Sequence, residues 1–512
     1  MASRRDELNA YTFAKKRTVA AFLQPSPSGT EEGAPKPLRA LVPGLVVGAL
    51  VIAGFGAWGM FRPTAPKGWD DPGRKVIVGK QSTTRYVVLS TGKGKDKKTL
   101  LHPVLNLASA RLLLNPDDFQ VVQVDDKTLD LGKPPRGPIL GIPYAPDRLP
   151  AAEDAGTAKR WAVCEQPGGG SGGSVQKAAF VFAKRDKDRA AGRNKLGPGQ
   201  MLYVKGQKDS AQYLIDDIGT KYRINEKVPS LMVALIGQDQ KPQQVTDDWL
   251  DTLKTGDRID FPVLPAPAGT TAGAGLDKEQ DKVGMVLLAQ TGAGPQHYVV
   301  LPGKVQPVSD FTAWLLINAS SGIGMEGKAS TVDVAAVSGA DRKPFAGERN
   351  WPQRQVRQVN TVGGAGARDT VCSVLEHVGE KGETTLSTWA GPEYPADITT
   401  GGTSTYVTPG TGLLYMQTQG QQSRPNGGSL FLVTDTGLRY AVQANGDSDA
   451  SRSNIGTGDQ QKTSDGRPEP SDAQKRLGYA NVTPVLVPQE WSEFLSKGPR
   501  LDTNSARQPQ GS

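Results

Sequence analysis

Short apolar strands recur along this chain, and each pair of strands is followed by a stretch with helical spacing. Apolar residues at every second position are typical of strands, and apolar residues at i, i+3 and i+4 are typical of helices. The pattern predicts four β-β-α units. The paired strands are VIV and YVVL (from 76 and 86), LYV and YLI (202 and 213), MVLL and YVVL (285 and 298), and LLYM and FLV (413 and 431). The helix-like stretches are 102–114, 245–256, 306–316 and 487–498.

Two of these units share much of their sequence. WLDTLKTGDRID (249–260) matches WSEFLSKGPRLD (491–502), and upstream YLIDDIGTKYRI (213–224) matches FLVTDTGLRYAV (431–442). We expect each helix to pack on the hairpin of its own unit and Gly256 to cap the first helix. One such unit cannot bury its apolar face alone, so the units need neighbours. The predicted core residues are Tyr222, Trp249 and Leu253 in one unit and Tyr440, Trp491 and Leu495 in the other.

The two cysteines divide the four units into two halves. Cys164 lies between the first and second units, and Cys372 lies between the third and fourth, each at the end of a short strand. We therefore expect a central β-sheet flanked by four satellite units, with a pseudo-two-fold relation between the halves. The predicted fold class is α+β, mainly β, with an N-terminal transmembrane helix.

Low-complexity runs mark the boundaries between these parts. Glycine-rich or polar stretches at 165–174, 184–199, 265–275, 362–368 and 445–472 are typical of linkers or loop insertions. A chain of 512 residues is also too long for one core. The predicted segments are an N-terminal segment with an amphipathic helix at 1–37, a transmembrane helix at 38–62, repeats at 74–150, 196–264, 282–345 and 408–502, central core regions at 157–183 and 368–392, and a disordered tail at 503–512.

From Ala40 to Phe61 the chain contains no charged residue. A helix rises about 1.5 Å per residue, so this stretch is long enough to cross a bilayer and predicts a transmembrane helix. The stretch begins too deep in the chain for an ordinary signal peptide, and we expect it to be retained. Gly44 and Gly48 have the GxxxG spacing that lets a second helix approach closely.

Basic residues are denser before this helix than after it. Seven Lys or Arg residues precede Ala40, which favours a cytosolic N-terminus and an exported C-terminal part. Residues 4–23 also have apolar positions near one helical face, at Leu8, Tyr11, Val19 and Phe22, and a basic cluster on another. Two interpretations stay open: a helix that docks on a cytosolic partner or on anionic lipid, or a charge cluster that only sets the topology.

Charge and cysteine content limit the function classes. The 60 basic and 52 acidic residues leave a net charge of +8 spread along the chain, which does not favour a nucleic-acid surface. The two distant cysteines fit a structural disulfide between Cys164 and Cys372 in an oxidising compartment. The alternative, two buried free thiols in a cytosolic domain, requires the opposite membrane orientation.

Several stretches resemble one known family. HPVLNLASARLLL (102–114), RGPILGIPYAPDRLP (136–150) and LGYANVTPVLVPQEWSEFLSKGPRLD (477–502), with AYTFAKKRTVAAFL before a single span, are similar to EccB, the membrane-anchored B component of type VII (ESX-type) secretion systems. The resemblance covers nearly the whole chain, apart from the polar insertion at 445–472. It implies four repeats around a disulfide-bearing core and a homo-oligomer within a larger complex. The implied partners are an FtsK/SpoIIIE-type ATPase, a multi-spanning channel component and a subtilisin-like protease.

An enzyme is the weaker expectation. Gly322, Gly327 and Lys328 fit the phosphate-binding pattern G-x-x-x-x-G-K, but Ala329 replaces the hydroxyl that binds Mg²⁺. The motif also follows a helix-like stretch, whereas a phosphate loop joins a strand to a helix. Because ATP hydrolysis has been proposed for the family, ATP binding through these residues is kept as an alternative.

Other chemistries are not favoured by the sequence. The three histidines have no second His or Cys at ligand spacing, and no G-x-S-x-G motif occurs. We therefore expect no catalytic residue, no metal and no cofactor. The favoured function is a structural component of a secretion membrane complex; the alternatives are an extracytoplasmic NTPase that uses Lys328 and a cell-envelope module that holds wall polymer.

Overall fold

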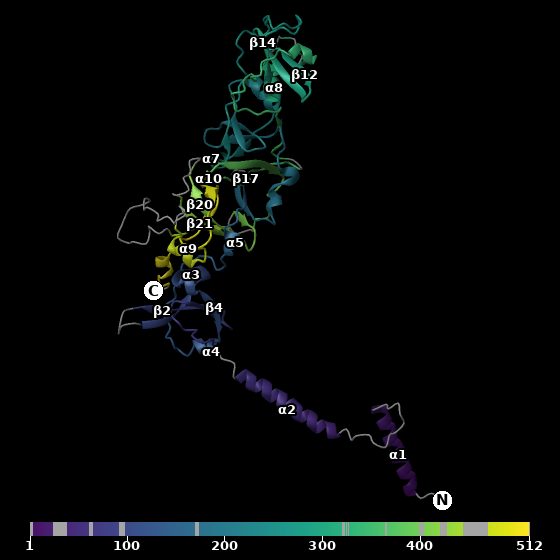
Figure 1. The fold of residues 1–512 in the computed structure, drawn as a ribbon, viewed down its shortest axis with the longest axis vertical. Helices are drawn as coiled ribbons and strands as arrows, with labels where there is room; N and C mark the ends of the chain where they lie inside the picture. Colours follow the sequence, from purple (N-terminus) through teal and green to yellow (C-terminus); the bar gives the residue numbers. More distant parts are fainter. Residues whose placement is uncertain are drawn as a thin grey trace. The chain divides into compact units, whose positions relative to one another are not determined.

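The fold is taken from a computed structural model of the whole chain (Figure 1). Two compact parts make up the chain, an N-terminal part at Met1–Lys67 and a C-terminal part at Gly68–Ser512. The residues that the structure describes are 4–23, 38–60, 65–91, 98–168, 174–319, 323, 325, 327–363, 366–398, 404–419, 428–443 and 469–510.

The N-terminal part contains the helices α1 (Arg4–Leu23) and α2 (Leu38–Met60). Within α2, the window Leu41–Gly59 is long and apolar enough to cross a membrane, in agreement with the predicted transmembrane helix. Residues 61 and 62 of the predicted span lie outside the described residues.

Helix α1 forms in the predicted stretch, but its faces are less distinct than expected. With about 3.6 residues per turn, Lys15 falls on the same side as Leu8 and Phe22, and Phe13 lies away from them. All four side chains point to solvent within this part of the chain. The expected separation of an apolar face from a basic face is therefore only partial.

The described residues of the C-terminal part form five β-sheets. The first sheet contains β1 (Lys75–Gly79), β2 (Arg85–Thr91), β3 (Lys98–Val104) and β4 (Gln120–Val124), and the second contains β7 (Gln200–Gly206), β8 (Gln212–Ile215), β9 (Thr220–Arg223), β10 (Gln243–Val245), β11 (Lys254–Thr255) and β16 (Arg357–Gln358). The third sheet contains β12 (Val286–Thr291), β13 (Gly294–Leu301), β14 (Lys304–Val308) and β15 (Ser330–Val332), and the fourth contains β20 (Gly412–Thr418), β21 (Leu430–Thr434), β22 (Leu438–Ala441), β23 (Val485–Pro488) and β24 (Ser496–Lys497). The fifth sheet, called the central sheet, contains β5 (Arg160–Gln166), β6 (Gln176–Phe182), β17 (Thr370–Val378), β18 (Thr384–Gly391) and β19 (Thr405–Val407).

Short helices connect these strands. The α-helices are α3 (Leu107–Leu113), α4 (Asp126–Leu129), α5 (Ala152–Ala155), α6 (Pro229–Ile236), α7 (Asp247–Asp251), α8 (Asp310–Ala319), α9 (Asp472–Arg476), α10 (Gln489–Ser492) and α11 (Thr503–Ala506). Four 3₁₀ turns are described as well, η3 (Pro116–Asp118), η4 (Lys187–Ala190), η5 (Gly192–Asn194) and η6 (Val334–Val337). The structure is thus mixed α/β with most of its regular elements in sheets.

The first four sheets share one plan. Each begins with three consecutive antiparallel strands, and a later strand pairs in parallel with the first of the three. In the second and fourth sheets, a further strand pairs in parallel with the third. The strand orders are β3-β2-β1-β4, β10-β7-β8-β9-β11, β14-β13-β12-β15 and β23-β20-β21-β22-β24.

Each of these sheets contains strands that the β-β-α prediction missed. The four stretches expected to be helical begin within the strands β3, β10, β14 and β23, and a helix follows in each. In the second and fourth sheets the stretch ends with a further short strand, β11 or β24. Helix α3 starts where the Asn106 side chain accepts a hydrogen bond from the Ser109 amide, and α7 starts where Thr246 accepts one from Trp249. In these two helices a capping side chain, not the apolar spacing alone, therefore marks where the helix begins.

The central sheet has the order β18-β17-β5-β6-β19, and one of its faces packs against two other sheets. Trp161 of β5 lies in one apolar core with Leu202 and Trp249 from the second sheet and with Leu413 and Trp491 from the fourth. The second and fourth sheets therefore meet on a single face of the central sheet, near α7 and α10 in Figure 1.

The first and third sheets lie further out than expected. Among the described residues, the first sheet shares an apolar core with the fourth, and this core contains Leu112 and Tyr440. Helix α8 of the third sheet shares a core with α6 of the second, which contains Phe311 and Leu231. The expectation of four satellites on the central sheet is thus wrong. The second and fourth sheets occupy one face, and residues such as Ala190 and Ala396 cover the other.

The predicted disordered tail at 503–512 is also wrong as far as residue 510. Helix α11 buries Ala506 in the core that the first and fourth sheets share. The Asp502 side chain caps this helix by accepting a hydrogen bond from the Ser505 amide, and Gln510 donates a hydrogen bond to the Gly141 carbonyl at 2.9 Å. The end of the chain therefore ties the fourth sheet to the first.

Candidate functional site

Cys164 and Cys372 occupy directly opposite positions on the neighbouring antiparallel strands β5 and β17. Their sulfur atoms lie 2.04 Å apart in a disulfide, and both side chains are fully buried. The structure thus contains the disulfide expected from the sequence. It joins residues that are 208 positions apart, so it links the two halves of the chain within one sheet.

The disulfide lies in an apolar layer on one face of the central sheet. Trp389 of β18 stands opposite Cys372, and Ala178 of β6 stands opposite Cys164. The buried side chains Phe180, Phe182 and Trp389 surround the two sulfurs in this layer. A buried disulfide in apolar surroundings is inert, so its role here is structural.

Glu165 follows Cys164 on β5 and points to the opposite face of the sheet. Its side chain is fully buried and accepts two hydrogen bonds from Thr246, from the amide at 2.8 Å and from the hydroxyl. Burial raises the pKa of Glu165 above its ordinary value, although both hydrogen bonds from Thr246 oppose that shift. Because Thr246 also caps α7, this carboxyl group holds the second sheet against the central sheet.

Trp249 strengthens the same contact. Its indole Nε1 donates a hydrogen bond to the Val163 carbonyl of β5 at 2.9 Å, and its ring is fully buried. Leu253 lies in the same core. The helix packs on its own hairpin, as expected, and Trp249 also lies against the central sheet.

The fourth sheet uses a different set of polar contacts around its tryptophan helix. Trp491 and Leu495 are buried in the core that contains Trp249. Ser492 of α10 forms hydrogen bonds with the Tyr415 hydroxyl at 2.8 Å and with Arg439 Nη1 at 2.5 Å. Burial raises the pKa of Tyr415 to about 12, so this phenol stays protonated and neutral at physiological pH.

The repeated tyrosines and glycines form matching pairs. A Cβ atom on Gly256 would overlap the Tyr222 ring, and one on Gly498 would overlap the Tyr440 ring. Helix α7 ends earlier, at the cap residue Thr252, so the expectation that Gly256 caps it is wrong. Glycine fits both positions because the tyrosine ring leaves no room for a Cβ atom there.

The candidate nucleotide motif lies in a different structural context from a phosphate loop. Gly327 and Lys328 form an exposed turn between α8 and β15, so the chain passes from helix to strand. Gly322 lies outside the described residues. A phosphate loop needs the reverse order, because the helix N-terminus binds the phosphate. The geometry of the described residues does not favour nucleotide binding here.

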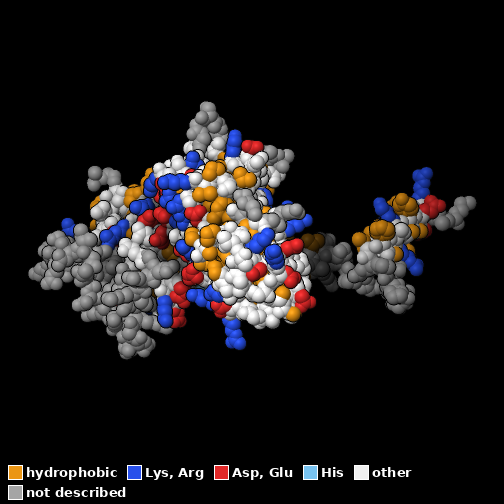
Figure 2. All heavy atoms as spheres, turned by 90° about the horizontal axis from the view of Figure 1, so that it is seen from above, with side chains coloured by type: hydrophobic (Ala, Val, Ile, Leu, Met, Phe, Trp, Pro, Cys, Tyr) orange, Lys and Arg blue, Asp and Glu red, His pale blue; other side chains and the backbone are white. Residues whose placement is uncertain are grey.

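Histidines do not form a metal centre in the described part of the chain, where no group of three or more His, Cys, Asp or Glu side chains converges. His102 Nδ1 lies 2.9 Å from the Pro138 carbonyl, and His297 Nδ1 lies 2.9 Å from an Asp310 carboxylate oxygen. These contacts have structural roles. On the face of the molecule in Figure 2, basic and acidic side chains are interspersed, as expected for a chain with a small net charge.

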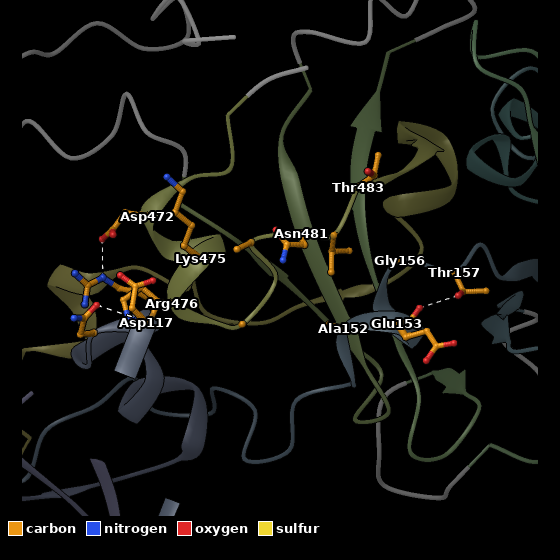
Figure 3. Close-up of a pocket in the computed structure, with 15 residues that line it drawn as sticks. Asp117, Ala152, Glu153, Gly156, Thr157, Asp472, Lys475, Arg476, Asn481 and Thr483 are labelled. Carbon is orange, nitrogen blue, oxygen red and sulfur yellow. Dashed lines mark hydrogen bonds and ion pairs between the residues drawn. The ribbon is translucent and has the colours of Figure 1, made fainter. Parts of the chain in front are cut away.

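A cavity of about 1040 Å³ lies where α9 of the fourth sheet approaches η3 and α5 (Figure 3). Arg476 donates a hydrogen bond to Asp472 at 2.7 Å on one wall. Arg476 also reaches the Leu114 carbonyl at 2.6 Å, and Arg111 reaches the Leu477 carbonyl at 3.1 Å in return. The hydrogen bonds of these two arginines therefore connect the first sheet to the fourth.

The fold and these contacts define a class of protein: a mainly β protein with a candidate membrane helix and a disulfide-linked central sheet. The chain belongs to the EccB family, because the model of "Type VII secretion system ESX-1, transport TM domain B" matches residues 1–511. The family expected from the resemblance is thereby confirmed.

Curated relatives agree with this family. The chain is 29% identical over 435 residues to "ESX-3 secretion system ATPase EccB3" of Mycolicibacterium smegmatis, which covers 79% of this chain and 76% of that relative. It is 25% identical over 475 residues to "ESX-2 secretion system ATPase EccB2" of Mycobacterium tuberculosis, with 86% of each chain covered.

Solved structures show the same fold. The "EccB3 dimer from the ESX-3 core complex" is 24% identical with a TM-score of 0.56, covering 85% of this chain and 99% of that chain. A chain of the "intact ESX-5 inner membrane complex" is 21% identical with a TM-score of 0.54, covering 100% of this chain and 96% of that chain.

Proposed function

We propose that this protein is a structural core component of a type VII (ESX-type) secretion membrane complex, which it anchors and organises on the extracytoplasmic side of the membrane. The observation that carries this proposal is the family match over residues 1–511 together with the candidate membrane helix α2. The contacts described above support a scaffold, because the polar groups of the central sheet hold neighbouring sheets in place. The partners expected are the ATPase, the channel component and the protease that the family resemblance implies.

The C-terminal part is proposed to lie outside the cytosol. The excess of basic residues before α2 and the buried disulfide both support this orientation. Protease added to intact spheroplasts should degrade Gly68–Ser512, while an epitope at the N-terminus stays protected. Protection of the C-terminal part, with loss of the epitope in intact spheroplasts, would reverse the proposed orientation.

The four similar sheets are proposed to be repeats in two halves related by a pseudo-two-fold axis, within the segment boundaries given above. The shared strand plan, the Tyr222–Gly256 and Tyr440–Gly498 pairs and the opposed cysteines support this. The second and fourth repeats are then the pair closest to the axis, because both meet the central sheet.

Assembly into a complex is proposed to involve the N-terminal part, with α1 binding a cytosolic partner and Gly44 and Gly48 packing α2 against another membrane helix. Similar proteins occur in an EccB3 dimer and in an ESX-5 inner membrane complex, which supports an oligomer here. Deleting residues 4–23 should leave the protein in the membrane but shift it to a smaller size on a native gel. Full complex size after the deletion would make the segment a topology signal only.

ATP hydrolysis is the second candidate, favoured by the names of the curated relatives, which call them ATPases. Lys328 is the residue through which it would act. Detergent-purified protein should then turn over ATP, and Lys328→Ala should abolish the turnover. No turnover by the wild type would remove this candidate, and equal turnover by wild type and Lys328→Ala would exclude Lys328 as the residue responsible. No bound cofactor is proposed for the scaffold function.

A further inference from the structure

The two outer edges of the first sheet differ. Along β3, Leu101 and Val104 pair with Arg136 and Leu140, so a following segment covers that edge. The outer edge strand β14 of the third sheet is covered in the same way by residues 341–345. Along β4, by contrast, the described part of the chain supplies no strand beyond the pairing with β1.

Strand β4 has the features of an edge that accepts another strand. Its sequence, QVVQV, contains no charge and no proline. The Val124 carbonyl accepts a hydrogen bond from the Lys80 amide, so the backbone groups of every second residue face β1. The backbone N–H and C=O groups of successive residues in a strand point alternately to its two sides, so those groups of Val121 and Gln123 point away from β1. Within the described residues these outward groups have no backbone partner, and Val121 is 56% exposed.

Acidic residues stand at both ends of this strand. Asp117 and Asp118 precede it, and Asp125 and Asp126 follow it. A hydrogen bond from the Ser82 hydroxyl is the main cause that lowers the pKa of Asp126, so this carboxylate stays charged. Natural edge strands are usually protected by charges within the strand, by proline or by a covering segment. Here the charges lie outside the strand, and no described strand covers its uncharged centre.

The charges also select the kind of strand that fits. A second copy of β4 would bring acidic residues opposite acidic residues in an antiparallel or a parallel pairing, which is unfavourable. Arg74 offsets only part of this charge, through an exposed pair with Asp118 at 3.5 Å. A strand with basic residues at both ends would instead meet opposite charges at each end.

We propose that β4 is an open docking edge for an extended segment of another protein, with a neutral, β-branched centre and Lys or Arg at both ends. The segment adds to the first sheet as a strand next to β4. Main-chain hydrogen bonds to Val121 and Gln123 provide the affinity, and the flanking acidic residues select the basic ends. This inference does not depend on the secretion function proposed above.

The test uses the detergent-purified full chain and a labelled peptide, Lys-Thr-Val-Thr-Val-Thr-Lys, followed by fluorescence anisotropy. Saturable binding is expected for the wild type and for Val121→Thr, which keeps the amide. Val121→Pro removes an outward donor and leaves the pairing with β1 intact, so binding should weaken by about ten-fold or more. A peptide with Glu at both ends should bind about ten-fold more weakly than the basic peptide.

Three results of the binding assay would overturn the proposal. These are no saturable binding of the basic peptide, equal binding by Val121→Pro and the wild type, and equal or tighter binding of the acidic peptide. Gln123→Pro, at the other outward position, replaces Val121→Pro if the latter lowers the unfolding temperature. If either proline changed the oligomeric size of the peptide-free protein, the edge would join copies of this chain, and the proposal would be wrong.

Discussion

Trp249 and Trp491 are expected to depend on each other for stability. Both rings are buried in the single core where the second and fourth sheets meet Trp161, and the helices that carry them are in contact. Replacing a buried Trp by Ala costs about 3 to 5 kcal/mol of unfolding free energy. For Trp249 the lost hydrogen bond to the Val163 carbonyl, 2.9 Å long, adds about 1 kcal/mol.

The double variant should cost less than the sum of the two single variants. Once one ring is missing, the core around the other is already loosened, so its removal costs less. Neighbouring residues in one cluster show interaction energies of about 0.5 to 3 kcal/mol. Trp249→Phe is the matched control, because it keeps an aromatic ring in the core, removes the indole donor and leaves a smaller cavity than Ala does.

The assay is urea denaturation of the detergent-purified full chain for Trp249→Ala, Trp491→Ala and the double variant. Limited proteolysis then shows which segments become accessible. If the two single effects add within about 0.5 kcal/mol, the tryptophans act independently, and the shared core described here does not couple the sheets. Cleavage confined to one sheet in each single variant would point to the same conclusion.

Three further predictions follow from the disulfide, Glu165 and the C-terminal helix. Replacing Cys164 and Cys372 by Ala should lower the unfolding free energy by up to about 5 kcal/mol, because the disulfide closes a loop of 208 residues. When the wild type is unfolded without reductant and treated with a thiol-alkylating reagent, mass measurement should show no added alkyl group. Burial raises the pKa of Glu165 in the folded state, so the protonated Glu165 stabilises the fold below the pKa of the unfolded state. This stabilisation is lost as the pH rises through the pKa of the folded state. The unfolding free energy of the wild type relative to Glu165→Gln should therefore fall as the pH rises from the acidic range towards neutral. Deleting residues 503–510 should cost about 2 to 3 kcal/mol, from two hydrogen bonds and a buried Ala506, and should raise hydrogen exchange in α3.

Each of these has a result that contradicts it. Two alkyl groups on the unreduced protein would show free thiols and remove a main support for export. A pH-independent difference between wild type and Glu165→Gln would mean that the carboxyl group titrates alike in both states. Unchanged exchange in α3 after the deletion would show that the tail does not hold the first sheet.

The strands and the pairing of the cysteines were accessible from the sequence because their signals are local. Period-two apolar runs predicted the first two strands of each of the first four sheets, and matching positions in the two halves predicted the bond between Cys164 and Cys372. The arrangement of the sheets was not accessible in this way. A sheet can pack on the central sheet or on another neighbour, depending on which of its faces is left uncovered once its strands have paired. The apolar sequence pattern around Phe311 in α8 is the same for both arrangements, so the pattern does not distinguish them.

Glu165 shows what the sequence analysis missed and which signal was present. In the strand RWAVCEQ an acidic residue interrupts a buried apolar run beside a cysteine. A buried carboxyl group without hydrogen-bond donors destabilises the fold, so its presence in this run indicates a contact with donors on another element. The donors are the amide and hydroxyl of Thr246, 81 residues away, and only the fold brings them together.

The repeated glycine gives the clearest case of a pattern seen without its cause. Gly256 and Gly498 were recognised as equivalent, but a glycine after a helix suggested a cap, which is the commonest local explanation. The structure shows that Tyr222 and Tyr440, each on the third strand of its sheet, lie against these glycines. Substituting Ala at either glycine would therefore displace a buried tyrosine ring, an effect that a capping role does not predict. The two tyrosines also occupy equivalent positions in the repeated stretches, so the sequence comparison already contains both residues of each contact. It does not show that the tyrosine and the glycine lie close together in space.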